Sequence, residues 1–586
     1  MDSIRKAGEI WKQYLDGVKY QQSMGFTTDF PKFISFKEGD QWAAVTENTK
    51  NLPRPVFNIT EMFIRSKRAA VTNQGLSLVY TPLEVFDDEE TQARAEQGAK
   101  DFTDFAKIMW ENLDQEELNN EFVDDAVTVG TGILHYYWDP NKKGGNQLKW
   151  NGDLQGEVLD PLNVFFANPH RKKVQDQEWI IIQDRMTVKE ARDLARREGI
   201  AEELVRLIGA DNNESGEYTA ETKEVTENDK ITVLLKYFKK DGAVYYSKST
   251  SSLVIIDDRL LTPEVEGSTY KMGLYPIALM SCIRRKKCIY GLGYAQDVIA
   301  INKAVNQLKA MQLLNAIQCG NPALVTRPNA IRQKITNQGG QIITDYSPNG
   351  DGIRYMQPPN FSTIFSQLGN EMFELARTTT GVTDVSTGET LGANMAASAI
   401  IALQNQAKTP IKELQNRYFS AIKEVGDIWL EFFKAYYNMD RNMIVEDEEG
   451  KAENRIFNGS NYADIDYKLK VEVAVASDKE TLAVSLLDSM RQREDINKEQ
   501  YVELMPDAAM PFKADIKEIW KKEKQDVLVQ AMGQIKQQQM IIDQLQGQQG
   551  NVEQSNAMLG QALGQIKQQG EIINQMGGMG NEMQGM

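Results

Sequence analysis

The sequence has 586 residues, more than one hydrophobic core can organise, and no apolar run in it reaches the roughly eighteen residues needed to span a bilayer. Its formal net charge is −17, whereas proteins that bind nucleic acid usually carry a basic surface. Its three cysteines are too few for a disulfide framework, which indicates a reducing cytosol. The lack of a long apolar run predicts no membrane partner.

The N-terminal quarter reads as helical. We expect helices over residues 1–24 and 58–75, with a loop-rich stretch between them, and an acidic helical region over 88–128. The second helix is predicted to place one set of side chains on its buried side: Ile59, Met62, Phe63, Ala70 and Val71. The acidic region has apolar residues at helical spacing: Phe102, Phe105, Ile108, Met109, Leu113, Leu118 and Phe122.

From about residue 130 the pattern changes to strands. Before a charged helix over 188–209 the predicted strands are 132–140, 148–150, 156–166 and 179–185. After a polar loop at 211–229 they are 231–238, 244–247 and 253–256. The short connections imply antiparallel pairing, so the class predicted for this region is α+β.

A helix over 294–318 comes next, with an apolar stripe formed by Val298, Ile301, Val305, Leu308 and Met311. Asn302, Lys303, Asn306 and Lys309 lie outside that stripe. A turn-rich segment follows, with short predicted strands at 323–325 and 341–343, and then a helix over 361–379. The sequence therefore predicts a small β module held between two helices.

The last regular elements are longer. A loop over 378–392 precedes a helix predicted from 394 to 437, in which Pro410 should cause a kink because proline removes a backbone donor. Residues 465–476 alternate strictly and predict a half-buried strand, and 478–525 read as charged helix.

A heptad pattern runs through the Gln-, Met- and Gly-rich C-terminal segment. Its apolar positions predict a self-associating coiled helix: Leu528, Ile535, Ile542, Leu545, Val552, Leu559, Leu563, Ile566 and Ile573. Gln549, Asn556 and Gly570 interrupt the seam and should weaken it. A disordered low-complexity tail is the alternative interpretation.

Candidate chemistry is sparse. His135 and His170 have no companion in sequence, and Cys282 and Cys288 lack a second ligand pair, so neither a catalytic nor a metal site is predicted. No phosphate-binding loop occurs, and no cofactor is predicted. Carboxylates are too abundant for counting to exclude a nuclease cluster.

One charged run stands apart in this acidic chain. Arg284, Arg285, Lys286 and Lys287 follow one another just before the helix at 294–318. A solvated loop and a functional contact are equally compatible with this run.

The order of these parts resembles the portal protein of tailed bacteriophages, in the short-tailed-phage form with a C-terminal helical barrel. The resemblance covers essentially the whole chain. It rests on Arg-Pro-Val-Phe-Asn at 54–58 before a helix, and on Gly-Thr-Gly at 130–132 before Tyr-Trp-Asp-Pro at 137–140. It also rests on Pro-Leu-Asn-Val-Phe-Phe at 161–166, and on Gly-Leu-Gly-Tyr-Ala at 291–295 opening the helix that carries Asn302 and Asn306.

The resemblance implies a portal fold with a wing, a helical stem, a small clip, a helical crown and a barrel. The wing would be 1–292 together with 380–476, which contains a tunnel loop, the long kinked helix and a returning strand. The stem would be 293–318 and 361–379, the clip 319–360, the crown 477–525 and the barrel 526–586.

The same resemblance implies a structural protein and not an enzyme. It would form a dodecameric ring at one capsid vertex, assembled in the host cytoplasm, through which double-stranded DNA passes without sequence specificity during packaging and ejection. Its partners would be terminase, a head–tail adaptor, the major capsid protein and a scaffold protein.

Candidate contact residues follow from these assignments. For the DNA channel or the subunit contacts they are Arg284, Arg285, Lys286, Lys287, Lys303, Lys309, Asn394 and Lys408. For partners of the clip they are Arg327, Arg332 and Lys334. Another ring- or tube-forming connector, or a scaffold protein, is the first alternative, and a nuclease is the second.

Overall fold

The computed structural model describes residues 2–144, 150–211, 229–263, 270–320, 324–335, 342–350, 352–356, 363–380, 409–446 and 452–473. It also describes scattered residues between 484 and 564, of which 496–505 form the longest stretch. The chain divides into two compact units, one comprising Met1–Ile444 with Asn454–Ala474, and the other Val445–Glu453 with Val475–Met586. The first unit mixes helices with antiparallel sheets, which confirms the α+β class.

The N-terminal helices and the first strand are α1 (Asp2–Ser23), α2 (Phe26–Lys37), α3 (Ile59–Thr72), β1 (Leu76–Pro82), α4 (Glu89–Asn112) and α5 (Gln115–Val129). The predicted helices at 1–24, 58–75 and 88–128 are confirmed, the last as two helices. Helix α2 was not predicted, although four phenylalanines at helical spacing are all buried in it: Phe26, Phe30, Phe33 and Phe36.

The buried face of α3 differs from the predicted one at a single step. Ile59, Phe63 and Val71 are buried as expected, but Met62 is 39% exposed and Ile64 takes its place in the core. Helix α3 packs on α5 as well as on the helix at 295–320. Because it has two neighbours, it buries a wider arc of its surface than a single apolar stripe.

The strands between residues 131 and 281 form two antiparallel sheets, in the orders β3-β2-β9 and β4-β5-β6-β7-β8. Their bounds are β2 (Thr131–Gly144), β3 (Trp150–Val158), β4 (Val164–Phe166), β5 (Trp179–Thr187), β6 (Lys230–Lys240), β7 (Ala243–Ser249), β8 (Val254–Leu260) and β9 (Ile277–Ser281). The antiparallel pairing is confirmed.

Three strand predictions in this region differ from the structure in their limits. The predicted strand at 156–166 is divided, because Pro161 opens the 3-10 turn η1 (Pro161–Asn163) between β3 and β4. Of the strand predicted at 148–150 the described residue is Trp150, which begins β3, and β2 extends to Gly144 instead of ending in a turn at Pro140. The charged helix at 188–209 is likewise two helices, α6 (Val188–Arg197) and α7 (Glu202–Val205).

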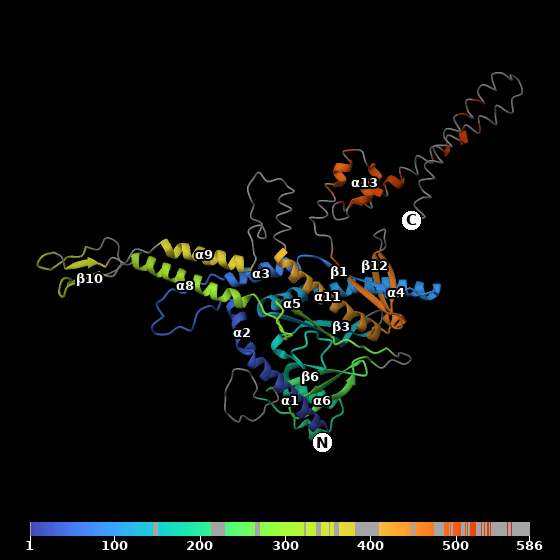
Figure 1. Ribbon diagram of the computed structural model, residues 1–586, viewed down its shortest axis with the longest axis horizontal. Helices are drawn as coiled ribbons and strands as arrows, with labels where there is room; N and C mark the ends of the chain where they lie inside the picture. The colour runs from blue at the N-terminus through green and yellow to red at the C-terminus, as the bar shows by residue number, and fades with distance from the viewer. Residues whose placement is uncertain are drawn as a thin grey trace. The chain divides into compact units, whose positions relative to one another are not determined.

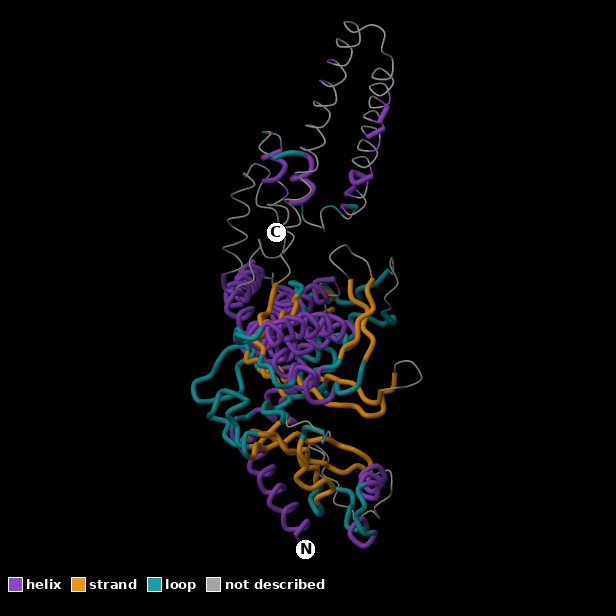
Figure 2. Tube along the Cα trace, turned by 90° about the vertical axis from the view of Figure 1, so that its right-hand side faces the viewer, coloured by secondary structure: helices purple, strands orange, loops and turns teal. Residues whose placement is uncertain are grey.

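Helices cover both faces of the five-stranded sheet (Figures 1 and 2). On one face α1 packs through Ala7, Ile10 and Tyr14 against Phe165 and Leu234. On the other face α6 packs through a separate set of side chains, and the residues of that core include Val188, Ala191, Ala195, Ile231, Val233 and Leu253. Neighbouring residues of one strand thus serve opposite cores, as the period of two requires.

Helices α8 (Ala295–Gly320) and α9 (Thr363–Thr380) lie side by side, with β10 (Leu324–Thr326) and β11 (Ile353–Tyr355) beyond the end of α8 (Figure 1). Both helices were predicted. The predicted strand at 341–343 is wrong, because β10 pairs with β11 and the described residues of that segment, led by the 85% exposed Ile342, form no strand. Asp345 explains the change of partner, since its carboxylate accepts from Ser347 N and Gly352 N and turns the chain toward β11.

Helix α11 (Thr409–Tyr436) is the described part of the long helix, and its core side includes Trp429, Phe432 and Phe433. The kink predicted at Pro410 depends on residues 394–408, which lie outside the described part of the chain. Strand β14 (Tyr467–Val473) pairs antiparallel with β1 and alternates as predicted, with Tyr467 and Leu469 buried.

The remaining elements are β12 (Arg441–Glu446), β13 (Ala452–Phe457), the 3-10 turn η3 (Gly459–Tyr462) and, in the second unit, α13 (Lys498–Leu504). Helix α13 begins with a reciprocal cap between Asn497 and Gln500. Within the part of the chain that the structure covers, no helix has the length and apolar character to cross a membrane.

Candidate channel and subunit-contact surfaces

A close backbone junction anchors the start of α8. Gly130 has φ of 104°, and a Cβ on Gly291 would lie 2.2 Å from the carbonyl oxygen of Gly130. A Cβ on Gly293 would lie 2.1 Å from the carbonyl oxygen of Thr128. Gly130, Gly291 and Gly293 therefore let the end of α5 and the start of α8 approach to a distance that side chains forbid.

Three buried amides then fix α8 to the segment between α2 and α3. We call Gln41, Asn302 and Asn306 the amide clamp. The Oδ1 atom of Asn302 accepts from Thr60 N at 2.9 Å and from Thr60 Oγ1 at 3.1 Å. Its Nδ2 atom donates to Gln41 Oε1 at 2.9 Å and to the Phe57 carbonyl at 3.0 Å.

Asn306 completes the clamp one turn further along α8. Its Nδ2 atom donates to Gln41 Oε1 at 2.5 Å, and its Oδ1 atom accepts from Phe57 N at 2.9 Å. Asn302 is 0% exposed and Asn306 2% exposed, so each amide atom is desolvated and depends on these partners. The pair spaced by four residues was visible in the sequence as lying outside the apolar stripe, but its partner Gln41 was not predicted.

The two lysines of α8 lie beside this clamp. The ammonium of Lys303 stands 5.5 Å from the ring centroid of Phe36, and that of Lys309 stands 6.0 Å from the ring centroid of Phe57. Each aliphatic stem therefore packs on an aromatic ring while the charge remains at the surface. Lys303 is exposed and Lys309 is half-buried.

The basic run forms a turn closed by the bridge between Ile283 and Leu292. Arg284, Lys286 and Lys287 are exposed, while the guanidinium of Arg285 lies 5.7 Å from the ring centroid of Phe26. The carbonyl of Lys287 accepts from His170 Nδ1 at 2.8 Å. The turn is therefore held in place and still presents three cations to solvent.

The basic candidates near α8 do not form one patch. The turn at 284–287 packs on Phe26 at the start of α2, whereas Lys303 packs on Phe36 at its end. Ten residues of helix separate these two rings, which corresponds to about 15 Å. The structure thus brings the candidates together as two groups, with α2 between them.

The clip candidates lie on the module that follows α8. Arg327, Arg332 and Lys334 are all exposed, and the guanidinium of Arg332 lies 4.9 Å from the ring centroid of Tyr346. The same module exposes large apolar side chains, among them Ile342 at 85%, Tyr355 at 63% and Met356 at 60%. Such a mixture of cations and apolar groups is typical of a protein-binding surface.

Several candidates lie outside the described residues. These are Asn394 and Lys408 near the predicted tunnel loop, and the nine barrel positions Leu528, Ile535, Ile542, Leu545, Val552, Leu559, Leu563, Ile566 and Ile573. Their predicted roles stay predictions.

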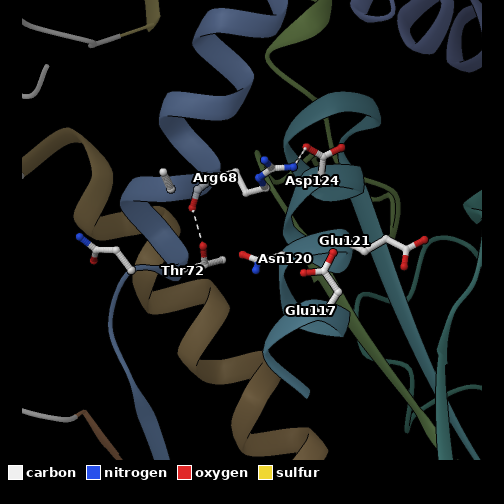
Figure 3. Close-up of a pocket in the computed structure, with 8 residues that line it drawn as sticks. Arg68, Thr72, Glu117, Asn120, Glu121 and Asp124 are labelled. Atoms are coloured by element: carbon white, nitrogen blue, oxygen red, sulfur yellow. Dashed lines mark hydrogen bonds and ion pairs between the residues drawn. The ribbon is translucent and has the colours of Figure 1, made fainter. Parts of the chain in front are cut away.

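Two of the hollows in the first unit contain ionisable side chains with close partners. One, of about 480 Å³, lies between α3 and α5, where Arg68 pairs with Asp124 at 3.0 Å beside Glu117 and Glu121 (Figure 3). Asp124 also pairs with Lys37. Burial, followed by the charge of neighbouring Asp124, raises the pKa of the adjacent Asp125 carboxyl to about 7.

The second hollow, of about 550 Å³, lies between the three- and five-stranded sheets. His135 on β2 contacts Glu157 Oε1 through Nδ1 at 2.8 Å and Tyr237 Oη through Nε2 at 2.9 Å. Because Tyr237 belongs to β6, this imidazole joins the two sheets.

Among the described residues no group of three His, Cys, Asp or Glu side chains is placed to hold a metal ion. Cys282 and Cys288 are buried and Cys319 is exposed, all as free thiols. Burial raises the pKa of the Cys282 thiol to about 12, which keeps it protonated and unreactive near neutral pH.

Comparison with known proteins gives one family. The family model of phage P22-like portal proteins matches residues 33–575, which is nearly the whole chain and includes the clamp, both helices α8 and α9, and the module between them. No curated protein matches the chain significantly. The resemblance to portal proteins is therefore confirmed, and the chain belongs to the phage P22-like portal protein family.

Proposed function

We propose that twelve copies of this chain form the portal ring at one vertex of a phage capsid. Membership of the family makes the chain a structural, ring-forming phage protein of the head–tail connection, and not an enzyme. In our proposal double-stranded DNA passes through the ring during packaging and ejection. Terminase docks on it first and a head–tail adaptor afterwards. The observation that carries the proposal is the match over residues 33–575.

The parts are assigned from the order of elements. Residues 293–318 and 361–379 form the stem, 319–360 the clip, and 1–292 with 380–476 the wing. Residues 477–525 form the crown and 526–586 the barrel. The packing of α8 against α9, with the β10–β11 pair beyond α8, supports the assignment of stem and clip. The Gly130, Gly291 and Gly293 junction would then be the joint between wing and stem.

Charge supports a channel that does not hold DNA. Twelve copies at −17 each carry about −200, so the ring as a whole repels a polyanion. Exposed cations on α8 and on the turn at 284–287 form local exceptions, for contact with DNA or with a neighbouring subunit. Neutralising Arg284–Lys287 should impair packaging or ring assembly, and a variant normal in both would refute this role.

The clip is the proposed docking site for terminase and adaptor. Arg332 and Lys334 supply charge, and Ile342, Tyr355 and Met356 supply apolar area that is exposed in the single chain. The test is to replace residues 324–356 with a short Gly-Ser linker and supply this chain to a phage that lacks its own portal. Assembled but DNA-free heads are expected, and DNA-filled heads would contradict the proposal.

The alternatives are less well supported. A scaffold protein would be mostly helical, whereas the described part of the chain carries five sheets. A nuclease needs a metal-binding group of carboxylates, and incubation of plasmid DNA with the purified chain and Mg²⁺ or Mn²⁺ tests it directly.

A further inference from the structure

The segment between α2 and α3 forms an ordered arm, which we define as residues 42–57. Arg54 ties its two limbs together by donating to the Ala43 carbonyl at 2.7 Å and to Thr49 Oγ1 at 2.9 Å. Trp42 Nε1 donates to the Pro55 carbonyl at 3.0 Å, and Thr46 and Thr49 close the turn at the tip. The arm has no helix or strand, so these side chains determine its shape.

This ordered arm exposes apolar side chains to solvent. Val45 is 65% exposed, Leu52 46%, Val56 45% and Phe57 46%. A loop that served only as a connection would gain nothing from four large apolar groups at its surface. A preorganised apolar element loses little conformational entropy on binding, which suits it to docking.

The base of the arm packs on one face of α8. Further along the helix the same face is exposed to solvent. Residues 302, 306, 313 and 317 are spaced by four, seven and four, so they share one side of the helix. The amide clamp covers the first two of these positions. Leu313 and Ile317 follow about 10 and 16 Å further along the axis and remain 44% and 48% exposed.

We propose that the arm of one copy packs on the Leu313–Ile317 face of α8 in the neighbouring copy. This rests on the proposed ring, because a ring needs two different complementary surfaces on each subunit. The arm and the bare face begin at the same level of α8, since Phe57 contacts both Asn306 and Lys309. If the subunits are related by rotation about an axis parallel to the stem, the arm of one copy lies at the same height along that axis as the exposed face of its neighbour.

The occupant is a second copy and not the arm of the same chain. With its own arm in place, Leu313 is still 44% exposed, and the arm is held in that position by the clamp and by Arg54. From Trp42 to the turn at Glu47 the limb can extend roughly 16 Å. That reach exceeds the 8–10 Å that separates packed helices, so it suffices to contact an adjacent helix pair.

Cross-linking tests the proposal in the assembled protein. Val45→Cys and Leu313→Cys are combined in a Cys319→Ser background, because Cys319 is the exposed native thiol and Cys282 and Cys288 are buried. Purified rings are treated with a short bismaleimide and separated under denaturing conditions. A ladder of covalent dimers, trimers and larger species is expected. The control pairs Leu313→Cys with Val85→Cys, which is 88% exposed and lies between β1 and α4, and it should give no ladder.

The outcomes are distinguishable. Rings that give no ladder, or that give only a link within one chain, would overturn the arm contact and leave the proposed ring intact. A native chain that forms no ring would overturn both. As a second measurement, Val45→Asp should raise the concentration at which half of the rings dissociate at least tenfold, and Val85→Asp should leave it unchanged. Equal behaviour of these two variants would also refute the contact.

Discussion

Substitution of Asn302 by alanine should destabilise the first unit more than any change on the exposed side of α8. The Asn302 side chain makes four hydrogen bonds, to Thr60 N, Thr60 Oγ1, Gln41 Oε1 and the Phe57 carbonyl. Asn302 and Thr60 are both 0% exposed and Gln41 is 8% exposed, so water does not readily replace the lost amide. At about 1 kcal/mol for each bond, with a larger penalty for a buried group left unpaired, the loss should be about 3–5 kcal/mol.

Asn306→Ala removes two of the clamp bonds and should lower the free energy of unfolding by about 2–3 kcal/mol. Gln307→Ala is the matched control, because Gln307 is the exposed neighbour on the same helix and its loss should change stability by less than about 0.5 kcal/mol. The assay is urea unfolding at equal, dilute protein concentration, followed by circular dichroism at 222 nm. If Asn302→Ala unfolds at the same urea concentration as Gln307→Ala, the clamp does not secure α8.

Three further predictions concern the joints of the first unit. Gly293→Ala should unfold at clearly lower temperature, because its Cβ would lie 2.1 Å from Thr128 O, whereas Gly8→Ala, with open space around it in α1, should be neutral or stabilising by about 0.5–1 kcal/mol. Arg441→Ala should cost about 3 kcal/mol in urea unfolding, since it leaves the half-buried Asp153 without its ion pair at 3.1 Å; the exposed pair of Arg5 and Asp2 supplies an Arg5→Ala control expected to cost less than about 1 kcal/mol. Burial, reinforced by Asp427, raises the pKa of the Glu424 carboxyl to about 7, so the native state binds more protons than the unfolded state and stability should fall as the pH rises from about 4.5 to 7. Because part of this side chain reaches solvent, Glu424→Gln should reduce that fall by only about 1–2 kcal/mol, and an unchanged pH profile of unfolding would contradict the assignment.

Local patterns predicted much of the fold. The apolar periodicity of α11 and the strict alternation of β14 each reside in one continuous segment, so the side that faces the core could be recognised without knowing the partner. In α8 the predicted stripe is correct at Val298 and Val305 but wrong at Met311, which is 53% exposed. Asn302 and Asn306 are buried in its place, because their amides find hydrogen-bond partners in the segment before α3. The antiparallel sheets followed from the short connections between strands. The phenylalanine spacing of α2 carried the same kind of signal, which Pro31 and the following loop obscured.

Pairings between distant segments could not be predicted in this way. Strand β10 pairs with β11 and not with the segment at 341–343, which is closer in sequence. The hydrogen bonds that Asp345 accepts turn the chain there, and hydrophobic periodicity does not reveal such bonds. Gln41 and Asn302 are 261 residues apart, and no local sequence pattern around either residue predicts their contact. The glycines at 130 and 291 were recognised as parts of two separate motifs, but their mutual contact can be seen only in the folded structure.

Among the candidate contact residues near α8, Arg284, Lys286, Lys287 and Lys303 are exposed, whereas Arg285 and Lys309 are half-buried. The sequence could not show that α2 separates Lys303 from the turn at 284–287, because α2 itself was not predicted. The exposed arm escaped notice for a related reason, since its apolar side chains become informative only when they are seen outside the core.

The central claim is that copies of this chain assemble into a portal ring. The most direct test is the mass of the purified native assembly together with end-on electron micrographs of the same sample. A mass of about twelve subunits of 66.3 kDa and a central hole in every end-on particle are predicted. A chain that remains monomeric at high concentration would contradict the account.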